Sequence, residues 1–124
     1  QSGARLAFGS DWPVSSPNPL WGMHVAVNRT VFEGYPYGAT ERAVTDPLLP
    51  DQRLDIETAL AAYTLGSAYV NHLDDATGSI EVGKAADLVV LDQDLFKVDS
   101  SEIAEVEVLL TLIDGRPVFE SPDL

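Results

Sequence analysis

The sequence contains no cysteine and only two lysines (Lys84 and Lys97) among its 124 residues. The lack of cysteine excludes disulfide bonds and thiolate metal sites, and it fits the cytoplasmic location that we expect. No apolar run reaches the roughly 18 residues of a membrane-spanning helix, and the first residues lack the pattern of a signal peptide. Because the chain starts at Gln1 without an initiator Met, we expect it to be a piece of a longer protein.

Positive charge is scarce, with seven Lys and Arg against twenty Asp and Glu and a formal net charge of −13. Nucleic acid and anionic membranes repel such a surface, so we expect neither as a partner. Residues 1–73 carry seven acids and four bases, whereas residues 74–124 carry thirteen acids and three bases. An acid-rich, lysine-poor chain is typical of a high-salt cytoplasm and also of an ordinary acidic bacterial protein, and both explanations stay open.

The first part of the chain predicts one strand followed by a helix and a loop. Residues 5–9 form a short apolar run that predicts a strand, and Pro13 keeps the chain extended beyond it. Residues 20–29 carry apolar side chains at helical spacing, whereas residues 30–53 predict a long surface loop.

A second helical region follows this loop. Asp55 is expected to cap a helix that ends at Gly66, and Ser67 is expected to cap a short helix through Leu73.

The remainder of the chain predicts β structure. An apolar run over residues 87–92 and alternating apolar residues over 106–112 predict two strands. Asp114 and Gly115 form a two-residue hairpin signal. Pro117 cannot donate to a ladder, so it predicts an edge position for the return strand.

Two apparent binding motifs are better explained by structure. Gly78–Lys84 has the spacing of a phosphate-binding loop, but Ala85 follows where Ser or Thr is needed, and a strand is predicted next instead of a helix. A turn between strands is the better interpretation. His24 and His72 belong to no metal-binding pattern, so each is expected at a helix surface or an interface.

The candidate functional residues lie just past the first predicted strand and in the loops. Asp11 has the position of a catalytic or metal-binding carboxylate at a strand end, but Asp also caps turns, and spacing alone favours the turn. Trp12, Trp21, Tyr35 and Tyr37 either line the mouth of a pocket or anchor packing, and the sequence does not decide between the two.

Several segments resemble those of one family. Gly9–Val14 resembles the G-S-D-x-P segment after the last barrel strand of the amidohydrolase superfamily, in the branch called amidohydrolase family 3. Gly78–Asp92 resembles its G-S-I-x-x-G-K-x-A-D-L-V-V-L-D signature. Residues 26–29, 54–64 and 111–119 are also similar to family segments, so the resemblance covers nearly the whole chain in the family's order.

The resemblance implies an α/β fold. Residues 1–73 would be the C-terminal piece of a (β/α)8 barrel, with its last strand and helices, and residues 74–124 would be part of a small composite β-sandwich. A whole barrel takes about 250 residues. The family's H-x-H segment, its bridging Lys, Glu or Cys and its two later His ligands have no counterpart in this sequence.

The resemblance also implies that the full-length parent is a metal-dependent hydrolase of C–N bonds in small-molecule amides or related groups, with zinc or another divalent metal. Asp11 matches the family aspartate that contacts the metal and carries the proton to the departing nitrogen. The 124-residue chain alone is expected to be inactive and, because its strands lack neighbours, to self-associate. The alternative is a non-catalytic structural or assembly module.

The acidic half of the chain predicts that stability depends on salt. Thirteen acids against three bases in residues 74–124 repel one another, and the Debye length is still roughly 8 Å at about 0.15 M salt. If the protein is adapted to high salt, its melting midpoint should rise steadily from low salt to molar KCl. A midpoint that stays flat would indicate an ordinary acidic surface.

Overall fold

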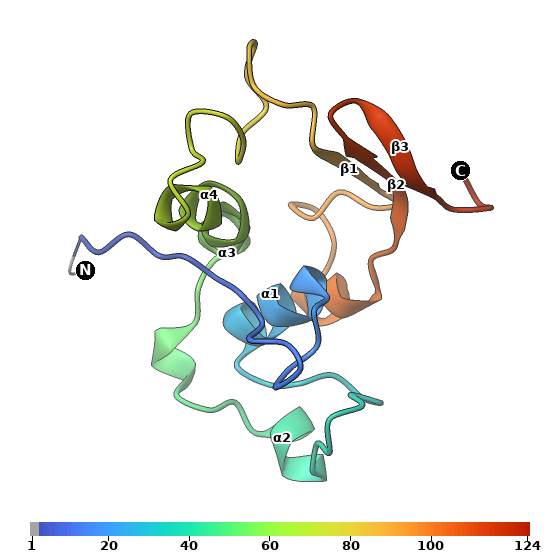
Figure 1. Cartoon of the computed structure of the whole chain (residues 1–124). Helices are drawn as coiled ribbons and strands as arrows, with labels where there is room; N and C mark the ends of the chain where they lie inside the picture. Colours follow the sequence, from blue (N-terminus) through green and yellow to red (C-terminus); the bar gives the residue numbers. More distant parts are fainter. Residues whose placement is uncertain (1–2) are drawn as a thin grey trace.

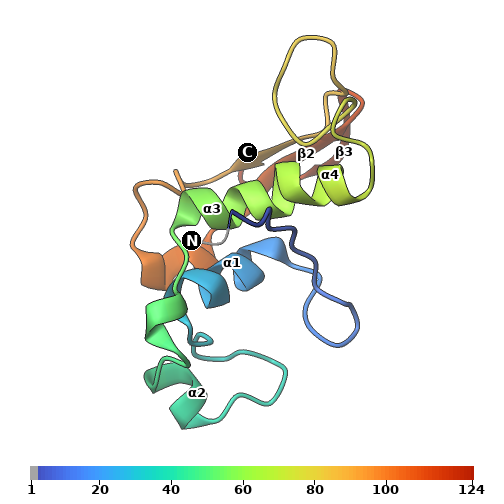
Figure 2. The ribbon, with the colours of Figure 1, turned by 90° about the vertical axis from the view of Figure 1, so that its left-hand side faces the viewer.

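The computed structural model describes residues 3–124. Helices make up the first part of the chain and a small antiparallel sheet ends it, as Figures 1 and 2 show. In chain order, the elements are α1 (Pro19–Asn28), α2 (Glu41–Thr45), η1 (Pro50–Gln52), α3 (Ile56–Ala61), η2 (Ala62–Gly66), α4 (Ser67–Val70), β1 (Leu88–Leu91), η3 (Ser100–Glu105), β2 (Val108–Ile113) and β3 (Arg116–Glu120). Among the described residues, no helix has the length and apolar character needed to cross a bilayer.

Helix α1 forms where the sequence predicts a helix. The Asn18 side chain accepts a hydrogen bond from the Leu20 N–H at 3.0 Å, and Pro19 occupies the first turn, where its missing N–H costs nothing. The buried residues of α1 include Leu20, Met23 and His24. These side chains pack toward η3 and α3, so α1 lies between the two.

The second helical region is one continuous helix through α3, η2 and α4. Asp55 caps it as predicted, because its carboxylate accepts the Thr58 N–H at 2.6 Å. The prediction that Gly66 ends one helix and Ser67 begins another is wrong. Both residues have right-handed helical backbone, and η2 is a π-helical turn in which the Ser67 N–H donates to the Ala62 oxygen, five residues earlier.

The strand predicted over residues 5–9 does not form in the described structure. A strand needs a neighbouring strand for its ladder of hydrogen bonds, and this segment runs along a helix instead. The Phe8 N–H donates to the Ala62 oxygen at 3.0 Å. Figures 1 and 2 both show the blue N-terminal segment passing beside the helix of α3 and α4.

The segment between α1 and α3 contains two short helices, α2 and η1, so the prediction of one long loop over residues 30–53 is wrong in part. The Thr40 hydroxyl caps α2 by accepting the Ala43 N–H at 3.3 Å. Two hydrogen bonds of 2.9 Å tie the segment to the end of α1, from the Leu48 N–H to the Arg29 oxygen and from the Arg29 Nε to the Leu48 oxygen.

The three strands form an antiparallel sheet with β2 in the centre. Strand β1 pairs with β2, with Leu88 opposite Leu112. Asp114 and Gly115 have φ values of 50° and 72°, the positive values that the predicted hairpin turn requires. Pro117 lies on the edge strand β3, which confirms its predicted position.

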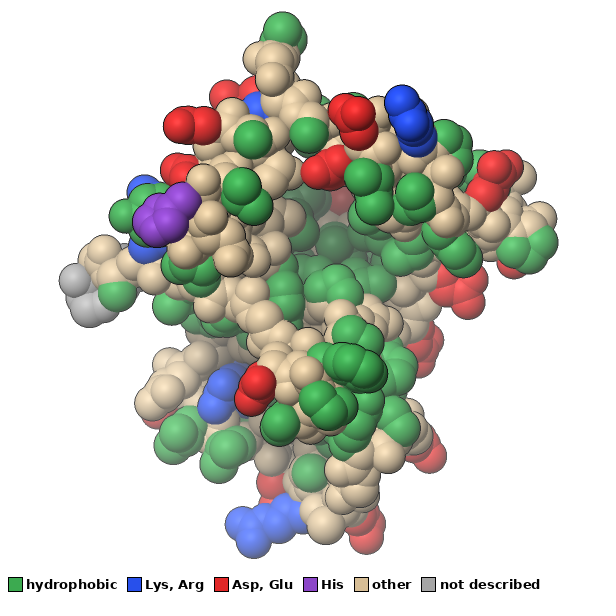
Figure 3. All heavy atoms as spheres, in the orientation of Figure 1, with side chains coloured by type: hydrophobic (Ala, Val, Ile, Leu, Met, Phe, Trp, Pro, Cys, Tyr) green, Lys and Arg blue, Asp and Glu red, His purple; other side chains and the backbone are tan. Residues whose placement is uncertain are grey.

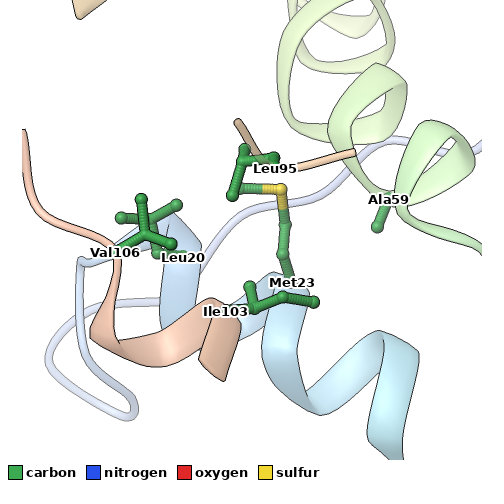
Figure 4. Packing of buried hydrophobic residues seen from close by; sticks show 6 residues of the cluster. All are labelled: Leu20, Met23, Ala59, Leu95, Ile103 and Val106. Atoms are coloured by element: carbon green, nitrogen blue, oxygen red, sulfur yellow. The ribbon is translucent and has the colours of Figure 1, made fainter. Parts of the chain in front are cut away.

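The hydrophobic core joins the helices to the segments that flank the sheet. Six buried residues of the described chain form this core, three from residues 1–73 and three from 74–124. One core thus crosses the predicted domain boundary, and the division into two domains stays a prediction. Figure 4 shows these residues, which are Leu20, Met23, Ala59, Leu95, Ile103 and Val106.

His24 lies in this core and not at a helix surface, which corrects that part of the prediction. Its side chain is 3% exposed and packs edge-on against Phe32, with ring centroids 5.6 Å apart. Its Nδ1 has no hydrogen-bond partner among the described residues. Burial therefore lowers the pKa of the imidazole, and the negative charge of Glu105 only partly opposes this effect.

An apolar groove separates the helix of η2 and α4 from β1. Its volume is about 960 Å³, and Figure 3 shows hydrophobic side chains lining the hollow between the two parts. Val89 and Phe96 on its wall are 54% and 59% exposed. Exposed apolar surface of this kind favours association, but self-association of the chain stays a prediction.

Acidification should destabilise the fold through His24. Because the pKa of His24 is lowered in the folded state, the unfolded chain binds the proton more readily. Stability is therefore full above the unfolded pKa of about 6.5 and falls as the pH drops toward the lower folded value. Thermal melts across this range should show a falling midpoint for the native sequence and a smaller fall for His24→Leu.

The matched control is His72→Leu, since His72 is the other histidine and is exposed. This variant should keep the pH dependence of the native chain. An unchanged pH dependence in His24→Leu would contradict the assignment to His24.

Candidate active site

The candidate site lies in the loop between the N-terminal segment and α1. Phe8 fixes the start of this loop through its hydrogen bond to the Ala62 oxygen and an edge-to-face contact with Tyr63, whose ring centroid is 5.3 Å away. Asn18 fixes the end of the loop by capping α1. Asp11 therefore lies on a short connection that is attached to the helices at both ends.

The loop closes in a tight turn around Asp11. The Val14 N–H donates to the Asp11 backbone oxygen at 2.8 Å, and the Trp12 N–H donates to the Ser10 hydroxyl at 3.2 Å. The Ser15 hydroxyl donates to the Ser10 backbone oxygen. Asp11 adopts a left-handed backbone with φ 51°, which Asp tolerates better than most residues.

The Asp11 carboxylate is exposed. Within residues 3–124 it accepts no hydrogen bond and forms no ion pair. Asp55 and Asp99 show how a capping aspartate behaves, because their carboxylates accept the backbone N–H groups of Thr58 and Ser101. Asp11 gives its turn a backbone oxygen but no side-chain hydrogen bond among the described residues. The choice between a catalytic Asp11 and a structural one stays a prediction.

Three of the four loop aromatics singled out in the sequence are packing anchors. Trp21 and Tyr35 both contact Phe32, with centroid distances of 5.1 and 5.4 Å, and Tyr37 adds a contact to Tyr35 at 5.6 Å. This cluster holds the segment after α1 against that helix. Trp12 differs, because it lies beside the candidate aspartate and is 66% exposed.

The described residues do not form a metal centre by themselves. No group of three or more His, Asp or Glu side chains in residues 3–124 is placed to hold a metal ion. His24 is buried in the core, and His72 lies on an exposed turn after α4. Asp11 would supply one ligand at most, fewer than the three or four protein ligands of a typical zinc site.

The glycine-rich segment Gly78–Lys84 forms turns, as predicted, but it lies between α4 and β1 and not between two strands. The Lys84 ammonium donates to the Asp74 backbone oxygen at 2.6 Å and to the Ser79 hydroxyl at 2.7 Å. The chain then continues to β1 and not into a helix whose N-terminus would bind phosphate.

Comparison with known proteins identifies the family to which this loop and turn belong. A model of the amidohydrolase family matches residues 1–119. The chain belongs to the amidohydrolase family. This confirms the resemblance carried by Gly9–Val14 and Gly78–Asp92.

Two relatives show how much of an amidohydrolase the chain represents. It is 34% identical over 119 residues to N-substituted formamide deformylase of Arthrobacter pascens, covering 96% of this chain and 20% of the relative. It is 31% identical over 121 residues to the putative amidohydrolase YtcJ of Bacillus subtilis, covering 95% and 21%. The chain thus spans about a fifth of the length of these curated relatives.

The fold is also similar to that of a solved amidohydrolase. The crystal structure of an amidohydrolase from Thermotoga maritima superposes with a TM-score of 0.61 at 29% identity, over 96% of this chain and 24% of that chain. This agrees with the predicted relation to amidohydrolases. The assignment of residues 1–73 to a barrel and of 74–124 to a sandwich stays a prediction.

Residues 1–124 should bind zinc only weakly, because the described part contains no cluster of metal ligands. Calorimetric titration with zinc should give a dissociation constant in the micromolar range or above. Structural zinc sites bind with about 10–16 kcal/mol, which is roughly tens of nanomolar or tighter. Submicromolar binding of one zinc per chain would show that the chain contains a complete site.

Proposed function

We propose that the full-length protein that carries this chain hydrolyses a C–N bond in a small-molecule amide or related group, with Asp11 as the proton carrier. The observation that supports this most directly is the Asp11 carboxylate, which is exposed and has no partner among the described residues, in the Gly-Ser-Asp segment of an amidohydrolase family member. The names of the relatives, a formamide deformylase and an amidohydrolase, support the reaction class.

Asp11 suits a proton transfer that runs in two directions. Hydrolysis of an amide needs a base that takes a proton from the attacking water and an acid that gives one to the departing nitrogen. One carboxylate can serve both needs in turn. It takes a proton from the water as the water oxygen bonds to the carbonyl carbon, and it gives this proton to the nitrogen as the C–N bond breaks. Since the Asp11 carboxylate has no partner within residues 3–124, no hydrogen bond to that part of the chain must break before it takes part.

A divalent metal such as zinc, when bound, would polarise the carbonyl group and make water a better nucleophile. Asp11 is the residue of this chain to which we assign contact with that metal. His24 does not serve, because it is buried in the core. The remaining ligands would come from the longer protein, as the relatives are about five times the length of this chain.

We therefore propose that residues 1–124 alone are catalytically inactive. They hold one candidate proton carrier but no set of three metal ligands within the described range. A carboxylate without a polarised carbonyl and an activated water gives little rate enhancement on an amide.

Replacing Asp11 by Asn in the full-length protein should abolish turnover and leave the fold intact. Asn has nearly the same shape but accepts no proton, and loss of a positioned acid–base group typically costs about 10²–10⁴ in rate. Initial rates on a panel of N-formyl and N-acyl amines, with melting midpoint and metal content measured in parallel, test this.

The matched control is Asp123→Asn, which removes the same charge at the other end of the chain. It should keep normal rates. Near-normal activity of Asp11→Asn with normal metal content would return Asp11 to a purely structural role.

A further inference from the structure

We propose that the π-helical turn η2 positions Asp11 by contacting the segments on both sides of its loop. Within this turn, Gly66 is a positioning residue for the reaction. This inference rests on the proposed role of Asp11. The structure supports it through three contacts between η2 and the two segments that flank the Asp11 loop.

The first contact is a close approach of backbone to backbone at Gly66. A Cβ atom at this position would lie 2.0 Å from the Leu6 carbonyl oxygen and 3.2 Å from the Ala7 Cα. Backbone atoms cannot rotate away as a side chain does, so any larger residue must push the N-terminal segment off the helix. Glycine within a helix normally costs stability relative to Ala, and here it makes the crossing possible.

The second contact is the hydrogen bond from the Phe8 N–H to the Ala62 oxygen at 3.0 Å. Ala62 is the first residue of η2, and its oxygen also accepts the Ser67 N–H. A carbonyl oxygen has two lone pairs and can accept both bonds. π-helical turns occur often at functional sites, and this one presents a carbonyl to the segment that leads to Asp11.

The third contact joins η2 to the far side of the loop through Tyr63. The Tyr63 ring packs edge-on against Phe8. Its hydroxyl oxygen lies only 1.9 Å from the position that a Cβ atom would take at Gly22 in α1, so α1 can approach this closely only with a glycine there. One turn of helix therefore touches both the segment before the Asp11 loop and the helix after it. Asp11 lies three residues beyond Phe8. A shift of the segment at Leu6 and Phe8 is therefore passed to Asp11.

The central test is Gly66→Ala in the full-length protein. The added methyl should displace residues 6–8, expose the Phe8 amide and misplace the Asp11 carboxylate. A misplacement of about 1 Å can cost 10²-fold in rate, so we expect kcat to fall by about that factor with little change in KM. We also expect faster hydrogen exchange at the Phe8 amide and a displaced pH profile of kcat, which a loss of folded protein alone would not produce.

The matched control is Thr64→Ala, in the same turn. The Thr64 hydroxyl bonds only back to Leu60 of its own helix among the described residues, and Ala favours a helix as much as it would at position 66. This variant should keep the native kcat, pH profile and Phe8 exchange. If Gly66→Ala does not fold, Tyr63→Leu removes the ring contacts with Phe8 and with Gly22 of α1 but keeps the backbone crossing at Gly66. It should lower kcat in the same way.

The outcomes separate this inference from the proposed function. If Asp11→Asn is inactive but Gly66→Ala keeps native kcat despite faster Phe8 exchange, η2 does not position Asp11 and the inference is wrong. The inference is also wrong if hydrogen exchange at the Phe8 amide is unchanged in Gly66→Ala. If Gly66→Ala does not fold, native kcat in Tyr63→Leu would likewise show that the inference is wrong. If Asp11→Asn is active, the proposed function fails, while the exchange measurement still reports whether η2 holds the segment.

Discussion

Three segments approach the helix of α3, η2 and α4 so closely that the contact points leave no room for a Cβ atom. The N-terminal segment crosses it at Gly66, α1 meets Tyr63 through Gly22, and the turn before β1 meets Ala68 at Gly78, where a Cβ would lie 2.6 Å from the Ala68 methyl. Contacts this close fix distance and orientation together. The placement of the first segment, of α1 and of the approach to the sheet all depend on this helix.

Local chemistry made much of this structure predictable from the sequence. The Asp55 cap, the apolar spacing of α1 and the Asp114 turn depend on neighbours within a few residues, so they are visible in the sequence. The short helices α2 and η1 were missed although α2 has a local cap at Thr40, and the other errors concern long-range contacts. Gly66 looks like a helix end because nothing nearby shows that a distant backbone crosses there.

The candidate site was also predictable from the sequence only where it depends on local residues. The family segment around Asp11 was visible in the sequence, whereas spacing alone favoured a turn cap over a catalytic carboxylate. The structure shows that the turn closes through the Asp11 backbone oxygen and leaves the carboxylate exposed. The support that η2 gives to the loop, and the burial of His24, depend on tertiary packing that no local pattern encodes.

The most direct measurement is a crystal structure of the full-length protein with zinc located by anomalous scattering. We expect an Asp11 oxygen at metal-ligand distance, about 2.0–2.2 Å, and the other ligands from outside residues 1–124. We also expect the Phe8 N–H to stay bonded to the Ala62 oxygen. A zinc ion bound elsewhere, with the Asp11 carboxylate about 4 Å or more from both metal and water, would show that Asp11 neither binds the metal nor carries the proton.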